Sequence, residues 1–201
     1  MPLNAAVEDT ESGSPFWLKR EKITFDAAYG GERVIAYLFL PKTGKAPYQT
    51  VIYVPGAGAI MTEHFDGLPY GDLTEYIITS GRALLYPIYK GTYERPAPRG
   101  RIWSFQSVVE TPLAYRDWLI QVTKDLSRCI DYLETREDID SAKIAFYGAS
   151  WGATLGPIML AVEDRLDTGI FVVGGLPPID LPRSWDVALY AQRVKAPVLM
   201  V

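Results

Sequence analysis

The sequence predicts an α/β protein with a mostly parallel central sheet, helices on both faces, and an antiparallel hairpin near the N-terminus. The first observation is that short apolar segments alternate with segments of helical periodicity, which is the pattern of βαβ units. The second is that these apolar segments are continuous, as in strands that are buried on both faces of a sheet. The third is a pair of extended segments that flank a glycine turn.

The first half of the chain supplies the hairpin, two buried strands and a short helix. A Tyr-Gly-Gly turn signal separates the two hairpin strands, and a Pro-Gly pair ends the first buried strand. The next helix stops at a glycine, and the strand after it stops before Pro87. These elements are expected at residues 23–25 and 33–40 (hairpin), 50–54 (strand), 70–80 (helix) and 82–86 (strand).

The second half begins with residues 87–110, which are rich in Gly, Pro, Arg and Tyr and predict an irregular segment. Apolar residues then recur on one helical face over 113–135, which predicts an amphipathic helix. The remaining expected elements are a strand at 143–147, a helix at 151–162, and strands at 169–173 and 197–201. We therefore expect one α/β domain over 16–201, preceded by a flexible tail or linker over 1–15.

Composition excludes several classes of protein. The chain has 201 residues, a net charge of −4, 48% hydrophobic residues, one Cys and one His. These fractions exclude a disordered chain, and the charge and the lack of a basic run give no support for nucleic-acid binding. A single Cys129 excludes an internal disulfide framework, and one Cys with one His gives no readable metal site. The pattern indicates no cofactor, no membrane span and no secretory signal, so we expect a cytoplasmic protein.

The segment Gly148-Ala149-Ser150-Trp151-Gly152 matches the pattern G-x-S-x-G. An expected strand runs into it and an expected helix leaves it, which is the context of a nucleophile elbow. Ser150 is then the catalytic nucleophile, and Gly148 and Gly152 keep side chains from colliding at the tight turn. The alternative is a serine that caps the helix in an ordinary strand–helix turn.

A second glycine-rich turn, Val54-Pro55-Gly56-Ala57-Gly58-Ala59, follows the expected strand at 50–54. In elbow enzymes, this loop and the residue after the serine each supply one backbone amide to the oxyanion hole. The candidate donors are therefore the amide of Trp151 and that of Ala57 or Gly58. The alternative is a plain glycine-rich turn. A phosphate loop is disfavoured, since neither G-x-x-x-x-G-K-[ST] nor G-x-G-x-x-G occurs.

Residues 86–101 follow a strand at the same end of the sheet and are a candidate substrate loop. Arginines there would bind an acidic substrate group, whereas the alternative is a solvated loop. The candidates in this loop are Tyr86, Tyr89, Tyr93 and Arg95, followed by Arg99 and Arg101. Three further aromatic residues, expected either to form an apolar pocket or to pack in the core, are Trp103, Phe105 and Trp185.

Together these stretches resemble the α/β-hydrolase fold, in particular the branch of dienelactone hydrolases, acetyl xylan esterases and prolyl-oligopeptidase-type peptidases. The resemblance rests on VIYVPGAGA (51–59), GRALLYPIYKGTYER (81–95), residues 115–156 and IFVVGGL (170–176), and it spans nearly all of 16–201. It implies a serine hydrolase whose catalytic triad runs Ser, acid, His along the chain.

The sequence departs from that pattern because no His follows Ser150. The resemblance would place the acid just after the strand at 197–201 and the His further on, so the last strands are expected to be missing. We therefore expect a complementing C-terminal fragment or second chain. His64 is more simply a polar loop residue than the base, and Asp180 more simply a turn residue than the acid. Three other carboxylates, Asp164, Asp167 and Asp186, fit ordinary surface or turn positions.

The function expected from these residues is hydrolysis of an ester of a small molecule, in the manner of a carboxylesterase, through an acyl-enzyme on Ser150. Two alternatives stay open. The first is a peptidase of the prolyl-oligopeptidase type with a peptide substrate. The second is a non-catalytic domain of this fold with a binding or regulatory role.

Overall fold

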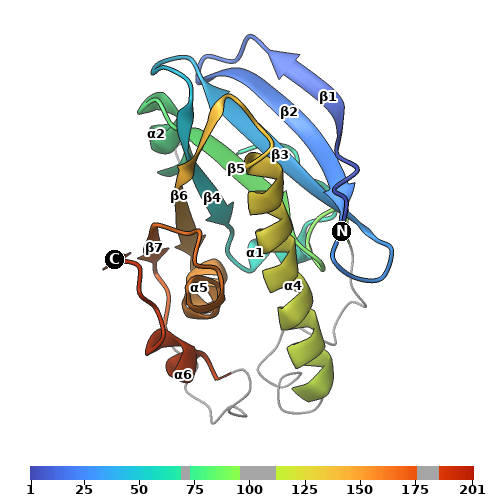
Figure 1. Cartoon of the computed structure of the whole chain (residues 1–201), viewed down its shortest axis with the longest axis vertical. Coiled ribbons are helices and arrows are strands. Elements are labelled where there is room, and N and C mark those ends of the chain that lie inside the picture. The colour runs from blue at the N-terminus through green and yellow to red at the C-terminus, as the bar shows by residue number, and fades with distance from the viewer. Residues whose placement is uncertain (69–72, 96–111, 176–185) are drawn as a thin grey trace.

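A central eight-stranded sheet organises the part of the chain that the structure, a computed structural model, describes: residues 1–68, 73–95, 112–175 and 186–201. The strand order is β1-β2-β3-β5-β4-β6-β7-β8 (Figure 1). The strands are β1 (Ala6–Ser12), β2 (Trp17–Asp26), β3 (Arg33–Pro41), β4 (Tyr48–Val54), β5 (Ala83–Ile88), β6 (Ile139–Ala149), β7 (Thr168–Val172) and β8 (Val198–Met200).

Five of these strands are mutually parallel. The pairs β5–β4, β4–β6, β6–β7 and β7–β8 are parallel, whereas β1–β2, β2–β3 and β3–β5 are antiparallel. The hairpin between β2 and β3 closes with Asp26 opposite Arg33. The prediction of a mostly parallel sheet with an antiparallel hairpin at one edge is therefore confirmed.

Helices cover both faces of the sheet, so that it is the middle of three layers. The helices are α1 (Gly58–Met61), α2 (Leu73–Thr79), α4 (Pro112–Leu133), α5 (Trp151–Val162) and α6 (Val187–Ala191). Figure 1 shows the long α4 crossing in front of the sheet beside α5, with α2 behind it. Successive strand residues point to opposite layers: Leu38 packs with the core under α4 and α5, and its neighbour Phe39 packs with Ile78 of α2.

The strand β5 is longer than the sequence predicts, because it continues through Pro87 to Ile88. Proline removes a backbone donor, which normally confines it to positions without a ladder hydrogen bond. Pairing between β4 and β5 ends at Leu85, and Pro87 lies opposite Ala36 of β3. The missing N–H therefore costs no hydrogen bond to β4.

The expectation of a flexible tail over residues 1–15 is wrong for strand β1. All its residues are exposed, so it carries no apolar pattern that would have indicated a strand. Its acidic residues instead form ion pairs with β2: Glu8 with Lys22 at 3.4 Å, and Glu11 with Arg20 at 3.0 Å. In the described residues, no helix combines the length and the apolar character needed to cross a bilayer.

Candidate active site

Ser150 is the single residue between strand β6 and helix α5. Its backbone has φ 50° and ψ −110°, a region that residues with a side chain rarely adopt. The residue is exposed, and its side chain makes no capping hydrogen bond to α5 within the described chain. The hydroxyl is therefore held at the end of the sheet without being used to cap the helix.

The two glycines of the motif allow three backbone segments to meet at this turn. A Cβ atom at Gly148 would lie 2.6 Å from the carbonyl carbon of Gly152. A Cβ atom at Gly152 would lie 2.1 Å from the carbonyl oxygen of Val54, at the end of β4. Both distances are shorter than any real carbon contact, so an alanine at either position would displace β4 or α5.

The loop after β4 runs directly beside Ser150. A Cβ atom at Gly56 would lie 3.5 Å from the Cβ of Ser150 and 4.0 Å from its Oγ. Ala57 and Gly58 are exposed, and among the described residues their amides have no hydrogen-bond acceptor. The loop thus presents backbone donors on the same side of the sheet as the serine. Trp151, the first residue of α5, is half-buried and its ring stacks on Trp118 with centroids 5.5 Å apart.

Three of the four candidate substrate-loop residues, Tyr86, Tyr89 and Arg95, are buried in the structure. Tyr86 lies within β5 and Tyr89 in the core, with exposed fractions of 1% and 0%. The chain turns back after β5 through hydrogen bonds from Thr92 N–H to Tyr89 O (3.0 Å) and from Arg95 N–H to Thr92 O (2.9 Å). This turn directs side chains inward, so the interpretation of Tyr86, Tyr89 and Arg95 as substrate-lining residues is corrected.

Arg95 is held in a buried polar network and is not available to bind an acidic substrate. Its guanidinium pairs with Asp125 of α4, and donates to Ile88 O at 2.9 Å and to the Tyr29 hydroxyl at 2.8 Å. The Lys90 amide also donates to the Asp125 carboxylate, at 3.0 Å. Burial lowers the pKa of Arg95, but the Asp125 carboxylate and the Tyr29 hydroxyl raise it above its ordinary value, so the guanidinium stays charged.

Tyr93 is the substrate-loop candidate that remains near the site. It is half-buried, its φ is 45°, and its N–H donates to the carbonyl of Ala59 at 3.1 Å. Its hydroxyl lies 2.8 Å from that of Tyr86, and burial raises its pKa. Tyr93 therefore ties the chain after β5 to the loop that follows β4. The other aromatic and arginine candidates, with Asp180, lie outside the described residues: Arg99, Arg101, Trp103, Phe105 and Trp185.

His64 lies on the exposed loop after α1. Its neighbour Phe65 is buried between Tyr37 and Tyr86, with ring centroids at 4.4 and 4.6 Å. The Phe65 amide donates to the carboxylate of Glu94 at 3.2 Å, which fixes the loop. The structure thus places His64 on a loop that is anchored one residue later and leaves its ring exposed.

The remaining candidate carboxylates have structural partners. Asp167 accepts from the Ile144 amide at 3.0 Å, Asp186 caps α6 by accepting from Ala188 at 3.0 Å, and Asp164 pairs with Lys195 at 3.3 Å. Cys129 lies buried on α4, and burial raises the pKa of its thiol, which disfavours the reactive thiolate. Across the described ranges, no three His, Cys, Asp or Glu side chains gather into a group that could hold a metal ion.

The segment directly after β7, which the sequence analysis weighed only for Asp180, forms a third side of the site. The amide of Ser150 donates to the carbonyl of Val172 at 2.7 Å. Val173 follows with φ 54° and a side chain that is 78% exposed, although it is apolar and β-branched. The Thr154 hydroxyl donates to the carbonyl of Gly175 at 3.1 Å. In the sequence, the pair Gly174-Gly175 is the one local signal of this close approach.

The sheet order, the turn at Ser150 and the glycine loop beside it define an α/β-hydrolase fold, and comparisons with solved structures agree. An acetyl xylan esterase from Paenibacillus sp. is similar over 100% of this chain and 73% of its own, with 22% identity and a TM-score of 0.68. Acetyl xylan esterase 1 from Thermoanaerobacterium sp. is similar over 100% and 72%, with 16% identity and a TM-score of 0.71.

The same fold also serves peptidases. A dipeptidyl aminopeptidase IV-type protein from Bacteroides ovatus is similar over 90% of this chain and 27% of its own, with 16% identity and a TM-score of 0.63. No protein-family model matches the chain, and no curated protein matches it. The structural likeness establishes the fold alone, because one fold can host many unrelated functions.

Proposed function

We propose that this chain is a serine hydrolase that cleaves a carboxylic ester through an acyl-enzyme on Ser150. The observation that carries the proposal is the backbone of Ser150, which has a positive φ at a strand-to-helix turn and leaves the hydroxyl exposed. In the proposed reaction, Ser150 Oγ attacks the ester carbonyl as its proton passes to a base. The alcohol leaves with that proton, and water then releases the acid from Ser150.

The oxyanion of the tetrahedral intermediate would be held by backbone amides. The donors we propose are the amide of Trp151, at the N-terminal end of α5, and that of Ala57 or Gly58. The proximity of Gly56 to Ser150 supports this choice, because it brings the loop within reach of a carbonyl bound at Oγ. Loss of one such donor typically lowers kcat about 10²–10³-fold.

The catalytic base is the one role in this mechanism for which the sequence has no residue at the expected place, after Ser150. No His follows Ser150, and His64 lies on an exposed loop. We therefore propose that a complementing segment, C-terminal in the fold or on a second chain, brings the His and its acid to Ser150. Gel filtration and intact mass of the active material test this, since activity from a lone 22.4 kDa species would contradict it.

A fluorophosphonate probe tests the proposed nucleophile, because it reacts with activated serines and leaves unactivated ones unlabelled. Peptide mass spectrometry should locate the label on Ser150, and Ser150→Ala should abolish it. His64→Gln is the matched test of the base and should label like the wild type. Absence of label in folded protein with its full set of chains would contradict the hydrolase proposal.

The second candidate is a non-catalytic domain with a binding or regulatory role, because one fold can host many unrelated functions. The labelling experiment separates the two, because a domain without an activated serine would not react. For a labelled protein, short p-nitrophenyl esters compared with aminoacyl p-nitroanilides then separate an esterase from a peptidase. We expect turnover of the esters and little of the anilides.

A further inference from the structure

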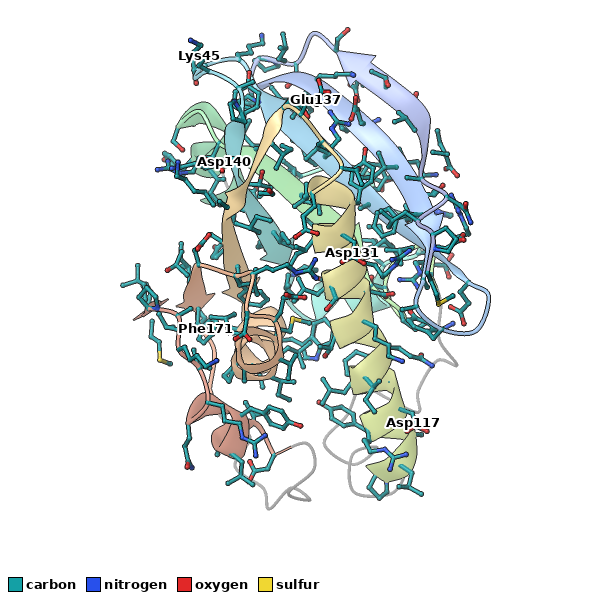
Figure 2. All side chains as sticks on the ribbon, viewed as in Figure 1. Lys45, Asp117, Asp131, Glu137, Asp140 and Phe171 are labelled. Atoms are coloured by element: carbon teal, nitrogen blue, oxygen red, sulfur yellow. The ribbon has the colours of Figure 1, made fainter. Side chains whose placement is uncertain are left out.

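An apolar cavity of about 260 Å³ lies beside helix α5, on the side away from α4. Its walls come from α5, from β7 and the loop that follows it, and from α6 and β8. Phe171 of β7, labelled in Figure 2, forms part of the wall next to α5. The lining residues are Ala153, Thr154, Pro157, Phe171, Gly174, Gly175, Ala191, Val194, Val198 and Met200.

The cavity begins one helical turn from the proposed nucleophile. Thr154, which lines it, donates its backbone N–H to the carbonyl of Ser150 at 3.0 Å. Residues four apart on a helix lie about 5–6 Å from each other. A chain of a few carbon atoms attached at Ser150 Oγ would therefore span the distance from the serine to the cavity.

The rim between Ser150 and the cavity is fixed by the backbone. Val172 accepts from Ser150 at 2.7 Å, and Val173 donates to the carbonyl of Val201 at 2.9 Å. Gly174 packs so tightly on α5 that a Cβ atom there would lie 2.5 Å from the Cβ of Ala153. The opening is thus set by tied backbone rather than by mobile side chains, as expected for a pre-formed binding site.

The chemistry of the wall selects an apolar occupant. None of the described residues that line the cavity carries a charge, and the hydroxyl of Thr154 already donates to Gly175. A polar or charged ligand group would lose its water there without gaining a partner, which is costly. The volume equals that of about eight to nine water-sized groups at ~30 Å³ each, so a linear chain of about eight carbons would fill it.

We propose that this cavity binds the apolar acyl chain of the ester, which makes acyl chains of about six to eight carbons the preferred substrate class. The inference rests on the proposed esterase function, and it adds the subsite that determines which acyl groups are preferred. Each methylene buried in the cavity should raise kcat/KM roughly fourfold, the factor that corresponds to ~0.8 kcal/mol. The rise should stop once the cavity is full.

A series of p-nitrophenyl esters from acetate to decanoate tests the inference. We expect kcat/KM to climb with chain length up to the octanoate and then to level off. Val194→Trp, which fills the cavity from the α6 side, should flatten this climb, so that the ratio of kcat/KM for octanoate to that for acetate falls. Val162→Trp at the exposed C-terminal end of α5, outside the cavity, is the matched control and should retain the climb. A flat wild-type profile, or equal effects of the two variants, would overturn the proposal.

Octanoate binding gives a readout that needs no catalysis. Octanoate should raise the Tm of the wild type and of Val162→Trp but not that of Val194→Trp. If the wild type with its full set of chains hydrolyses no ester yet shows this pattern, the hydrolase proposal fails and the cavity remains an apolar binding site. If octanoate shifts neither protein and no ester is cleaved, both proposals fail. Met200→Ala, which removes a wall instead of filling it, should weaken octanoate binding and checks that the tryptophan acts locally.

Discussion

Among the described residues, three of the four non-glycine residues with a positive φ follow strands of the parallel part of the sheet. Tyr93 follows β5, Ser150 follows β6 and Val173 follows β7, with φ of 45°, 50° and 54°. A positive φ costs a residue with a side chain about 1–2 kcal/mol. Strain of this kind persists where surrounding contacts hold it, and it gathers at functional sites. All three residues are held by backbone hydrogen bonds at the edge that carries Ser150.

Val173 allows this strain to be measured apart from packing, because its side chain is 78% exposed. We expect Val173→Asn to stabilise the protein by about 1 kcal/mol, since Asn adopts positive φ more readily than a β-branched residue. Urea denaturation measures the change. The control is Val7→Asn on β1, also exposed, where the extended backbone favours Val and the substitution should destabilise by up to about 1 kcal/mol. A loss of stability at both positions would show that Val173 carries no such strain.

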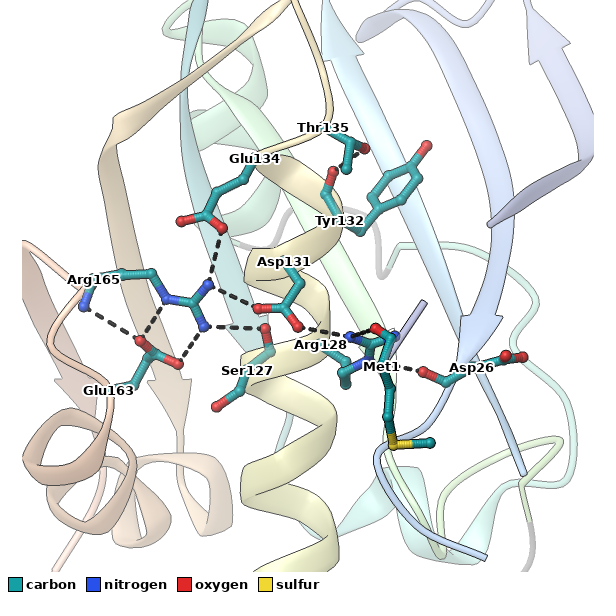
Figure 3. A network of polar contacts seen from close by, with 10 residues as sticks. All are labelled: Met1, Asp26, Ser127, Arg128, Asp131, Tyr132, Glu134, Thr135, Glu163 and Arg165. Carbon is teal, nitrogen blue, oxygen red and sulfur yellow. Dashed lines mark hydrogen bonds and ion pairs between the residues drawn. The ribbon is translucent and has the colours of Figure 1, made fainter. Parts of the chain in front are cut away.

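Two arginines that bind the same carboxylate, that of Asp131, connect helix α4 to the elements beside it (Figure 3). Arg128 of α4 donates to Asp131 at 2.9 Å, and also to the carbonyl of Asp26 at 2.9 Å. Arg165, from the loop after α5, donates to the other oxygen of Asp131 at 2.8 Å. Glu163 holds Arg165 through two further bonds of 2.8 Å. Asp131 therefore links the end of β2 to the loop between α5 and β7 through α4.

Removing Asp131 should loosen this link at a modest cost, because its side chain is 32% exposed and solvent screens the pairs. We expect Asp131→Ala to lower the free energy of unfolding by about 1–2 kcal/mol, which is the size of two solvent-screened ion pairs at the upper end of their range. High salt should reduce the loss, and urea denaturation at two salt concentrations measures both effects.

Asp117 provides the matched control on the same helix, as Figure 2 shows. It is 58% exposed and bonds its neighbour Arg116, so it joins no other element. Asp117→Ala should change stability by less than about 0.5 kcal/mol. Equal effects of the two substitutions would mean that Asp131 acts through helix propensity and not through the two arginines.

The elements that could be predicted from sequence are those whose burial imposes a regular pattern. Helix α5 begins at Trp151 and ends at Val162 as predicted, and α4 matches the apolar face to within two residues at either end. Strand β1 gave no signal because both its faces are exposed. The short helices α1 and α6 were missed because four or five residues carry too little periodicity to stand out from loop sequence.

The same distinction holds for the candidate site: features set by the local sequence could be predicted, and features set by distant partners could not. The turn at Ser150 could be placed because a strand, two glycines and a helix must follow one another along the chain. The position of Arg95 could not, because it depends on Asp125, which lies 30 residues further along the sequence. Hydrophobic periodicity reports whether a residue is buried in a regular element, and it carries no information on which distant partner a loop side chain meets.

The whole molecule has a sheet with two edges of opposite character. At one edge, β1 is exposed and acidic, and its charges pair with Lys22 and Arg20 of β2. At the other edge, β8 presents Val198, Leu199 and Met200 with exposed fractions of 36%, 58% and 69%. Charged residues protect a sheet edge from pairing with another chain, whereas an apolar edge favours it. The edge at β8 is therefore the edge at which a further strand would pair with the sheet.

This difference predicts where the protein associates with itself when β8 is unpaired. We expect the chain to self-associate with rising concentration, and Leu199→Lys to suppress this, since a buried unpaired ammonium would oppose strand pairing. Leu199 does not line the cavity beside α5, so the substitution leaves that site unchanged. Val7→Lys at the β1 edge is the control and should not alter association. Gel filtration with light scattering measures both variants. A wild type that stays monomeric at every concentration, or a Leu199→Lys variant that associates like the wild type, would show that β8 is not the associating edge.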